Sequence, residues 1–148
     1  MNAAPSQVRS LSRVVEHDEH LIAMYPPLAV SIYSAVTTGQ PFDQHRDHLL
    51  AVLAEGLVTH DEFDRAVQDA GQDDDAVGML TAAMAAQHRS LAARVDELAR
   101  ATTGLDAVAI TRTIHAILNL TLDLGRRILH HHGPKPASSG SDAEPLPG

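Results

Sequence analysis

The sequence predicts an all-α protein that folds as an antiparallel up-down-up-down four-helix bundle. Apolar residues recur at intervals of three and four along four long stretches, which is the spacing of one helix face. Short breaks rich in Gly, Pro or Asp separate these stretches, so consecutive helices must lie side by side and run in opposite directions. Alternation of apolar and polar residues, the pattern of a half-buried strand, never extends beyond a few positions.

The composition restricts the functions that the chain can have. Its 148 residues fit one domain, and the absence of cysteine excludes disulfides, thiolate metal sites and cysteine nucleophiles. A formal net charge of -8 argues against nucleic acid and anionic membranes as partners. No stretch has the pattern of a signal peptide or a membrane span, so we expect a soluble, cytoplasmic protein.

The chain divides into three parts. Residues 1–6 are expected to be a flexible N-terminus, and residues 7–132 are expected to form the bundle. Residues 133–148 consist mainly of Pro, Ser and Gly with little apolar content, which predicts a disordered tail.

The first helix is expected from near Ser6 to the break at Gly39 and Pro41. Pro26 and Pro27 fall inside it. Because each proline removes an amide donor and clashes with the preceding turn, we expect the helix to be kinked at these prolines or to break near them. Its apolar face, with spacings of three and four, consists of Val14, His17, Leu21, Met24, Leu28, Ile32 and Ala35.

The second helix is expected at residues 41–70. Thr59 and Glu62 have the spacing of a capping box, from which a new helix could begin. The apolar face keeps its phase across Gly56, however, and this favours one continuous helix. The face consists of Leu49, Leu53, Leu57, His60, Asp64 and Val67.

The third helix is expected around residues 77–98 and the fourth from about Leu105 to His132. The fourth helix has a wide apolar arc, which leaves room for a homodimer contact as well as for burial inside the bundle. The face of the third helix consists of Val77, Leu80, Met84, His88, Leu91, Val95 and Leu98.

Three of the four apolar faces carry a histidine, namely His17, His60 and His88, and Asp64 lies one turn beyond His60. At about 1.5 Å per residue from the turns, His17 and His60 are level within about 3 Å, and His88 is displaced by roughly 7 Å. A buried carboxylate needs a positive partner or a metal, and imidazoles with a carboxylate are ligands of first-row transition metals. We therefore expect a metal site at these four residues. A polar core network, in which Asp64 pairs with a protonated histidine, is the alternative.

The other histidines fit less well into the predicted core. His20 lies one turn from His17 but points toward the side of the bundle. Met24 and Met84 lie near the core histidines, where methionine is usually core filling, although a His/Met pair also suits heme or copper.

Motifs on three helices resemble those of the hemerythrin-like (HHE cation-binding) family. EHDEHL at 16–21 resembles the family's first-helix histidine motif, LVTHDEFDRAV at 57–67 its second-helix histidine and acid motif, and MAAQHRSLAARVDELA at 84–99 its third-helix histidine motif. The likeness covers about residues 10–132. It implies a four-helix bundle with a diiron-carboxylate site for O2, NO or peroxide.

The sequence departs from this family in its ligands. The second-helix glutamate is Asp64, and an upstream third-helix histidine is Met84. On the fourth helix the family's ligands align with Thr121 and Gly125, which cannot take their place and are expected to leave space for a small ligand.

The residues that resemble family ligands are therefore those of one iron, namely His17, His60 and Asp64, with His88 in addition. This implies an altered nonheme iron site, with a mononuclear iron as one option, since two histidines and one carboxylate with open positions are a known ligand set for such iron. One alternative is a bundle that has lost the metal and serves as a binding or regulatory module, or as an enzyme that uses the same side chains as acid–base groups. Heme held by two core histidines is a weaker alternative, and whether the chain is an enzyme stays open.

Overall fold

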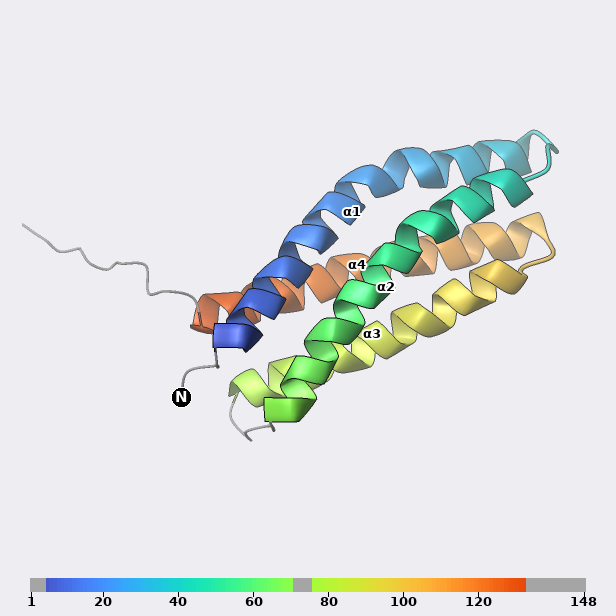
Figure 1. The fold of residues 1–148 in the computed structure, drawn as a ribbon. Coiled ribbons are helices and arrows are strands. Elements are labelled where there is room, and N and C mark those ends of the chain that lie inside the picture. The colour runs from blue at the N-terminus through green and yellow to red at the C-terminus, as the bar shows by residue number, and fades with distance from the viewer. Residues whose placement is uncertain (1–4, 71–75, 133–148) are drawn as a thin grey trace, which may run out of the picture.

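The computed structural model describes residues 5–70 and 76–132 (Figure 1), and all regular structure in these two ranges is helical. The prediction of an all-α chain with four helices is thereby confirmed. The helices are α1 (Pro5–Thr37), α2 (Asp43–Ala70), α3 (Ala76–Arg100) and α4 (Gly104–His132).

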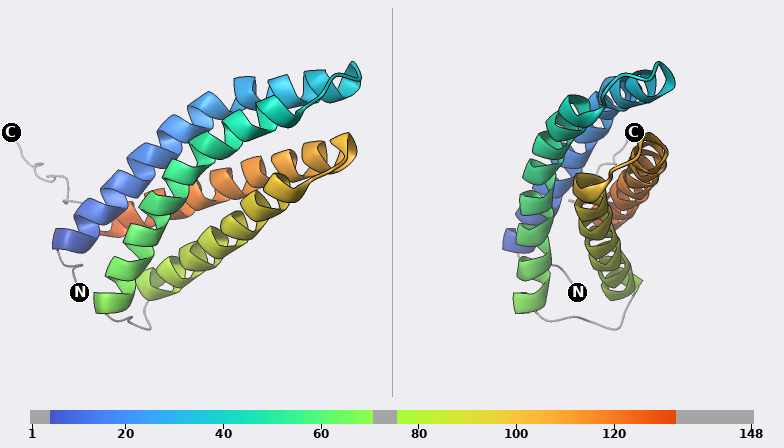
Figure 2. Two further views of the ribbon diagram at one scale, coloured as in Figure 1. Left: turned by 45° about the vertical axis from the view of Figure 1, so that its right-hand side comes forward. Right: turned by 90° about the vertical axis from the view of Figure 1, so that its right-hand side faces the viewer.

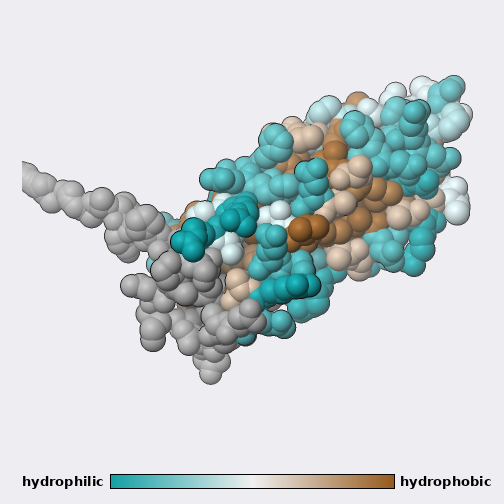
Figure 3. Space-filling model, in the orientation of Figure 1, coloured by the Kyte–Doolittle hydropathy of each residue, from teal (hydrophilic) through white to brown (hydrophobic). Residues whose placement is uncertain are grey.

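The helices lie lengthwise against one another, and each packs against two neighbours in the order α1, α2, α3, α4 and back to α1. Figure 2 shows the connections at residues 38–42 and 101–103 at the same end of the molecule. On the face seen in Figure 3, apolar residues gather midway along the molecule, over the line where α1 and α2 adjoin, with hydrophilic residues around them. No described helix has a stretch that is long and apolar enough to cross a bilayer.

Two rows of residues on α1, each with intervals of seven, face the core. The predicted face contained the row with Val14 and Leu21 but combined it with His17 and Met24, which are only half-buried. The structure instead buries Asp18 and Tyr25 completely. The row with Val14 and Leu21 gives spacings of three and four with the residues on either of its two flanks, that of His17 and Met24 or that of Asp18 and Tyr25. The apolar pattern therefore does not decide which flank is buried. The rows are Leu11, Asp18, Tyr25 and Ile32, and Val14, Leu21, Leu28 and Ala35.

Local chemistry explains where the first two helices end and begin. Gly39, with φ of +73°, closes α1, where the Gln40 amide donates to the Ala35 carbonyl at 2.7 Å and the Gly39 amide to the Val36 carbonyl at 3.3 Å. These two bonds form a Schellman cap, which favours glycine at the residue with positive φ. The helix α1 continues through both of its prolines. The helix α2 is unbroken across Gly56, as predicted, although it begins two residues after Pro41.

The turn between α3 and α4 is held against the other helix pair. Thr103 caps α4, because its hydroxyl accepts the Asp106 amide at 3.1 Å. A Cβ added to Gly104 would lie 2.8 Å from Cγ1 of Val36 on α1, so only glycine fits this approach without a shift. Arg46 of α2 donates to the Ala101 carbonyl at 2.8 Å.

Parts of the predicted organisation fall on residues that are not described. Of the predicted flexible N-terminus, residues 1–4 lie outside the described residues, and Pro5 and Ser6 belong to α1. The predicted tail at 133–148 and the acidic turn at 71–75 also lie outside them.

Candidate metal centre

A layer of buried polar residues crosses the bundle and divides its apolar core into two clusters. On every helix, residues of one cluster precede the layer and residues of the other follow it. Around Tyr25 and Leu53 lies the first cluster, and around Val14 and Phe63 lies the second. Each helix contributes one residue to this polar layer, which consists of Asp18, His60, His88 and Thr121.

The first pair of the layer joins α1 to α2. Nε2 of His60 and Oδ1 of Asp18 are 2.7 Å apart, and the two side chains are 2% and 0% exposed. When Nε2–H donates to the carboxylate, Nδ1 of the ring carries a lone pair. This Nδ1 and the second carboxylate oxygen, Oδ2, are buried without a hydrogen-bond partner among the described residues.

The second pair joins α2 to α3. Nδ1 of His88 lies 2.8 Å from Oδ1 and 3.0 Å from Oδ2 of Asp64. The carboxylate is 26% exposed, so water screens this pair more than the first one. The opposite nitrogen, Nε2 of His88, is buried and unpartnered within the described part of the chain. Phe63 holds the ring edge-on, with centroids 6.3 Å apart.

The two imidazoles stack on each other and so connect the pairs. Their centroids are 4.1 Å apart and their planes differ by 2°. The side-chain types suit a first-row transition metal. The arrangement, however, presents ring faces to each other, and nowhere in residues 5–70 and 76–132 are three His, Asp or Glu side chains close enough to hold one ion. An ion shared by both histidines would therefore require at least one ring to turn.

The structure brings together three of the four predicted ligands, His60, Asp64 and His88. His17 makes no hydrogen bond or ring contact with them. Its Nε2 faces Gly56, where an added Cβ would lie 3.1 Å away. The core position next to His60 is taken by Asp18, which the sequence analysis missed. The signal that could have found it is the interval of seven that places Asp18 midway between Leu11 and Tyr25.

On α4 the structure corrects the prediction of free space. Thr121 is fully buried, and its hydroxyl has no partner among the described residues. The space at Gly125 is filled, because an added Cβ would lie 3.0 Å from Cγ2 of Val15 and 3.3 Å from Cε of Met84. The missing side chain is thus compensated by side chains from α1 and α3. This is how a close-packed core avoids a void.

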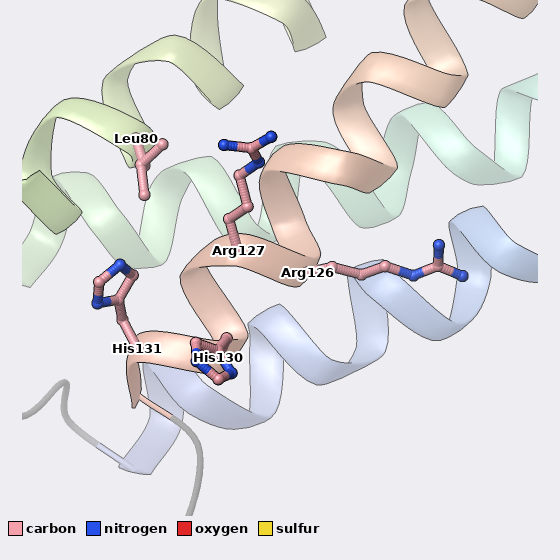
Figure 4. A pocket seen from close by; sticks show the side chains of 5 residues that line it. All are labelled: Leu80, Arg126, Arg127, His130 and His131. Atoms are coloured by element: carbon pink, nitrogen blue, oxygen red, sulfur yellow. The ribbon is translucent and has the colours of Figure 1, made fainter.

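The remaining histidines lie away from the layer. His115 stacks on Tyr25 with centroids 4.9 Å apart. At the end of α4, His130 and His131 line a pocket together with Leu80, Arg126 and Arg127 (Figure 4).

The two arginines of this pocket already have acidic partners. Arg126 points away from Arg127 and pairs with Glu19 at 2.8 Å, and Arg127 pairs with Asp123 at 3.0 Å. Asp123 lies on the exposed side of α4.

No protein-family model, curated protein or solved structure matches this chain. The likeness to hemerythrin-like domains therefore rests on the sequence motifs alone.

Proposed function

We propose that this chain is a hemerythrin-like metal-binding protein. Its polar layer holds an altered nonheme iron site, mononuclear in its simplest form, that binds or turns over O2, NO or peroxide. One observation carries the proposal. Each member of the polar layer has one buried polar atom without a partner among the described residues, and these atoms are Oδ2 of Asp18, Nδ1 of His60, Nε2 of His88 and Oγ1 of Thr121.

Such atoms are costly in a core that holds nothing else. A buried polar group without a partner costs about 1–3 kcal/mol, and native proteins keep few of them. Four at one level of the bundle support a bound ion, with or without water. An imidazole that donates one N–H to a carboxylate and keeps a lone pair on the other nitrogen is also the form in which histidine binds metals.

The proposed ligands are His60 and His88, with Asp18 and Asp64 as carboxylate ligands or as the groups that orient the two rings. His17 joins them only if its ring turns away from Gly56. A bound iron would supply a Lewis acid and an electron donor for a diatomic or peroxide ligand. The role of the chain is then to orient the imidazoles and to keep bulk water out of the layer.

The finer features of the predicted fold belong to the same proposal. We infer an antiparallel up-down-up-down bundle, which the shared end of the connections at 38–42 and 101–103 supports. We also infer a kink in α1 at Pro26 and Pro27, since each ring clashes with the carbonyl four residues earlier.

We further propose a cytoplasmic protein that binds no nucleic acid or membrane, and the wide apolar arc of α4 leaves a homodimer open.

Elemental analysis of untagged protein tests the metal. We expect roughly one iron or other first-row metal ion per chain, and less than about 0.2 per chain in His60→Ala and His88→Ala, because a real site needs its ligands. His48→Ala is the matched control, since it removes an exposed histidine of α2. A wild-type metal content below about 0.2 per chain, unchanged in His60→Ala, would overturn the proposal.

A second candidate function has its own supporting observation. Each buried imidazole already has a carboxylate as its hydrogen-bond partner, so the two pairs can form without an ion. The bundle would then be a metal-free binding or regulatory module, or an enzyme that uses the two His–Asp pairs as acid–base groups. Metal-stripped protein that keeps its full thermal midpoint and still binds a small molecule in a pH-dependent way would favour this candidate.

A further inference from the structure

A pocket of about 220 Å³ opens between α1 and α2, and its lining includes none of the four residues of the polar layer. Its apolar walls include Leu21, Met24 and Val52, and its polar groups are His17 and His20 of α1 and Glu55 of α2. The pocket thus combines two imidazoles and one carboxylate on two adjoining helices.

His17 is the half-buried part of this pocket. Its Nε2 is shielded from solvent and has no hydrogen-bond partner among the described residues. The ring is accommodated by Gly56, because any larger residue would place a Cβ 3.1 Å from Nε2. His17 lines the pocket, and a shielded imidazole nitrogen without a hydrogen-bond partner is a candidate ligand atom once the ring turns it toward the pocket.

His20 and Glu55 are the exposed parts. His20 lies three residues after His17, a spacing that places both side chains on one side of α1. Glu55 directly precedes Gly56 and is therefore level with His17 across the groove. Both side chains are exposed, and the Glu55 carboxylate forms no ion pair within the described ranges.

We propose that this pocket is a second metal site, which takes a divalent transition-metal ion such as Zn²⁺ through His17, His20 and Glu55. Two imidazoles and a carboxylate, with a fourth position open to water, are a common ligand set for zinc. The chain's charge of -8 favours a cation as well. The proposal does not depend on the proposed function, because His60, His88 and their carboxylates take no part in it.

The ligands do not form a closed set in the structure, where no three His, Asp or Glu side chains of the described residues are near enough to hold an ion. Closing the site needs new rotamers of His20 and Glu55, and a turn of the His17 ring that moves its Nε2 from Gly56 into the pocket. Since His20 and Glu55 are at the surface, their rotations leave the core packing unchanged.

Zinc titration of the full chain, followed by calorimetry and by the histidine ring signals in NMR, tests this site. All proteins carry His130→Gln, His131→Gln and His132→Gln, so that this run does not compete for zinc. We expect Zn²⁺ to shift the rings of His17 and His20. We expect His20→Ala and Glu55→Gln each to weaken this binding event at least about tenfold.

The controls separate the pocket from the polar layer. His48→Ala removes another exposed histidine and should leave the binding event unchanged. His88→Ala should also leave it unchanged, whatever happens in the core. Zinc binding in His20→Ala as tight as in the parent, or ring shifts confined to His60 and His88, would overturn the proposal.

Discussion

The imidazole rings of His60 and His88 lie face to face in the middle of the bundle, with centroids 4.1 Å apart. One nitrogen at the edge of each ring pairs with a carboxylate, that of Asp18 for His60 and that of Asp64 for His88. The four side chains form one continuous polar row through α1, α2 and α3. A row of this kind fixes how the helices align, because a shift of one turn would separate buried groups from their partners.

Removing Asp18 should be among the most destabilising single changes in this protein. Asp18→Ala leaves the Nε2–H of His60 buried without its acceptor, and an unsatisfied buried donor of this kind costs about 1–3 kcal/mol. The free energy of unfolding, measured with denaturant on metal-free protein, checks this. Glu19→Gln is the matched control, because it alters only an exposed pair with Arg126 and should change stability by about 1 kcal/mol or less. A loss of less than about 1 kcal/mol in Asp18→Ala would contradict the burial of this pair.

Replacing both members of the pair should have the opposite effect. In Asp18→Val with His60→Leu, no buried charge is left without a partner, so we expect a stability equal to the wild type or higher by about 1–4 kcal/mol. The same protein should lose its core metal. Together, the two results would show that the polar layer is kept for binding. A double variant as unstable as Asp18→Ala would instead show that the layer is needed for folding.

The buried phenol of Tyr25 should make the protein less stable in alkali. Its hydroxyl donates to the Thr111 carbonyl at 2.7 Å, and burial raises the pKa of this phenol far above its usual value of 10.0. The phenol therefore stays neutral in the folded chain, whereas it ionises in the unfolded chain. The stabilisation is fully present below pH 10 and is lost as the pH rises above it.

Denaturant unfolding at a series of alkaline pH values measures this effect, and phenolate absorbance follows the ionisation itself. Tyr25→Phe should have a flatter stability curve above pH 10, although it is less stable at neutral pH. The remaining phenol, Tyr33, also has a pKa raised by burial and provides the internal comparison. Ionisation of Tyr25 in the folded protein near its usual pKa would refute the prediction.

The contact between Gly104 and Val36 should make the first position of α4 sensitive to size. In Gly104→Ala the new Cβ would lie 2.8 Å from Cγ1 of Val36, a stiff β-branched side chain. We expect a loss of about 1–3 kcal/mol, as in other overpacked sites. Leu105→Ala is the control, because Leu105 is 81% exposed and should tolerate the change. Thermal unfolding of the two variants side by side decides the point.

The sequence alone was sufficient to predict the helices and to place part of the polar layer in the core. Spacings of three and four predicted four helices, and the constant phase across Gly56 predicted that α2 is continuous. His60 and His88 were predicted in the core and are buried there. These features depend on the local chain, because the side of a helix that is buried follows from where its apolar residues recur.

Only the tertiary structure decided which flank of α1 enters the core. His17 and Asp18 are adjacent, so they differ by about 100° of rotation about the helix axis. Both flanks share the row that contains Val14 and Leu21, and the apolar pattern favoured the flank with Met24. Contacts with α2 and α4 select the other flank, because Asp18 accepts a hydrogen bond from the ring of His60 and the Thr111 carbonyl accepts one from the hydroxyl of Tyr25. A partner on another helix is not visible in local spacing, and for that reason Asp18 was missed and His17 was placed too deep.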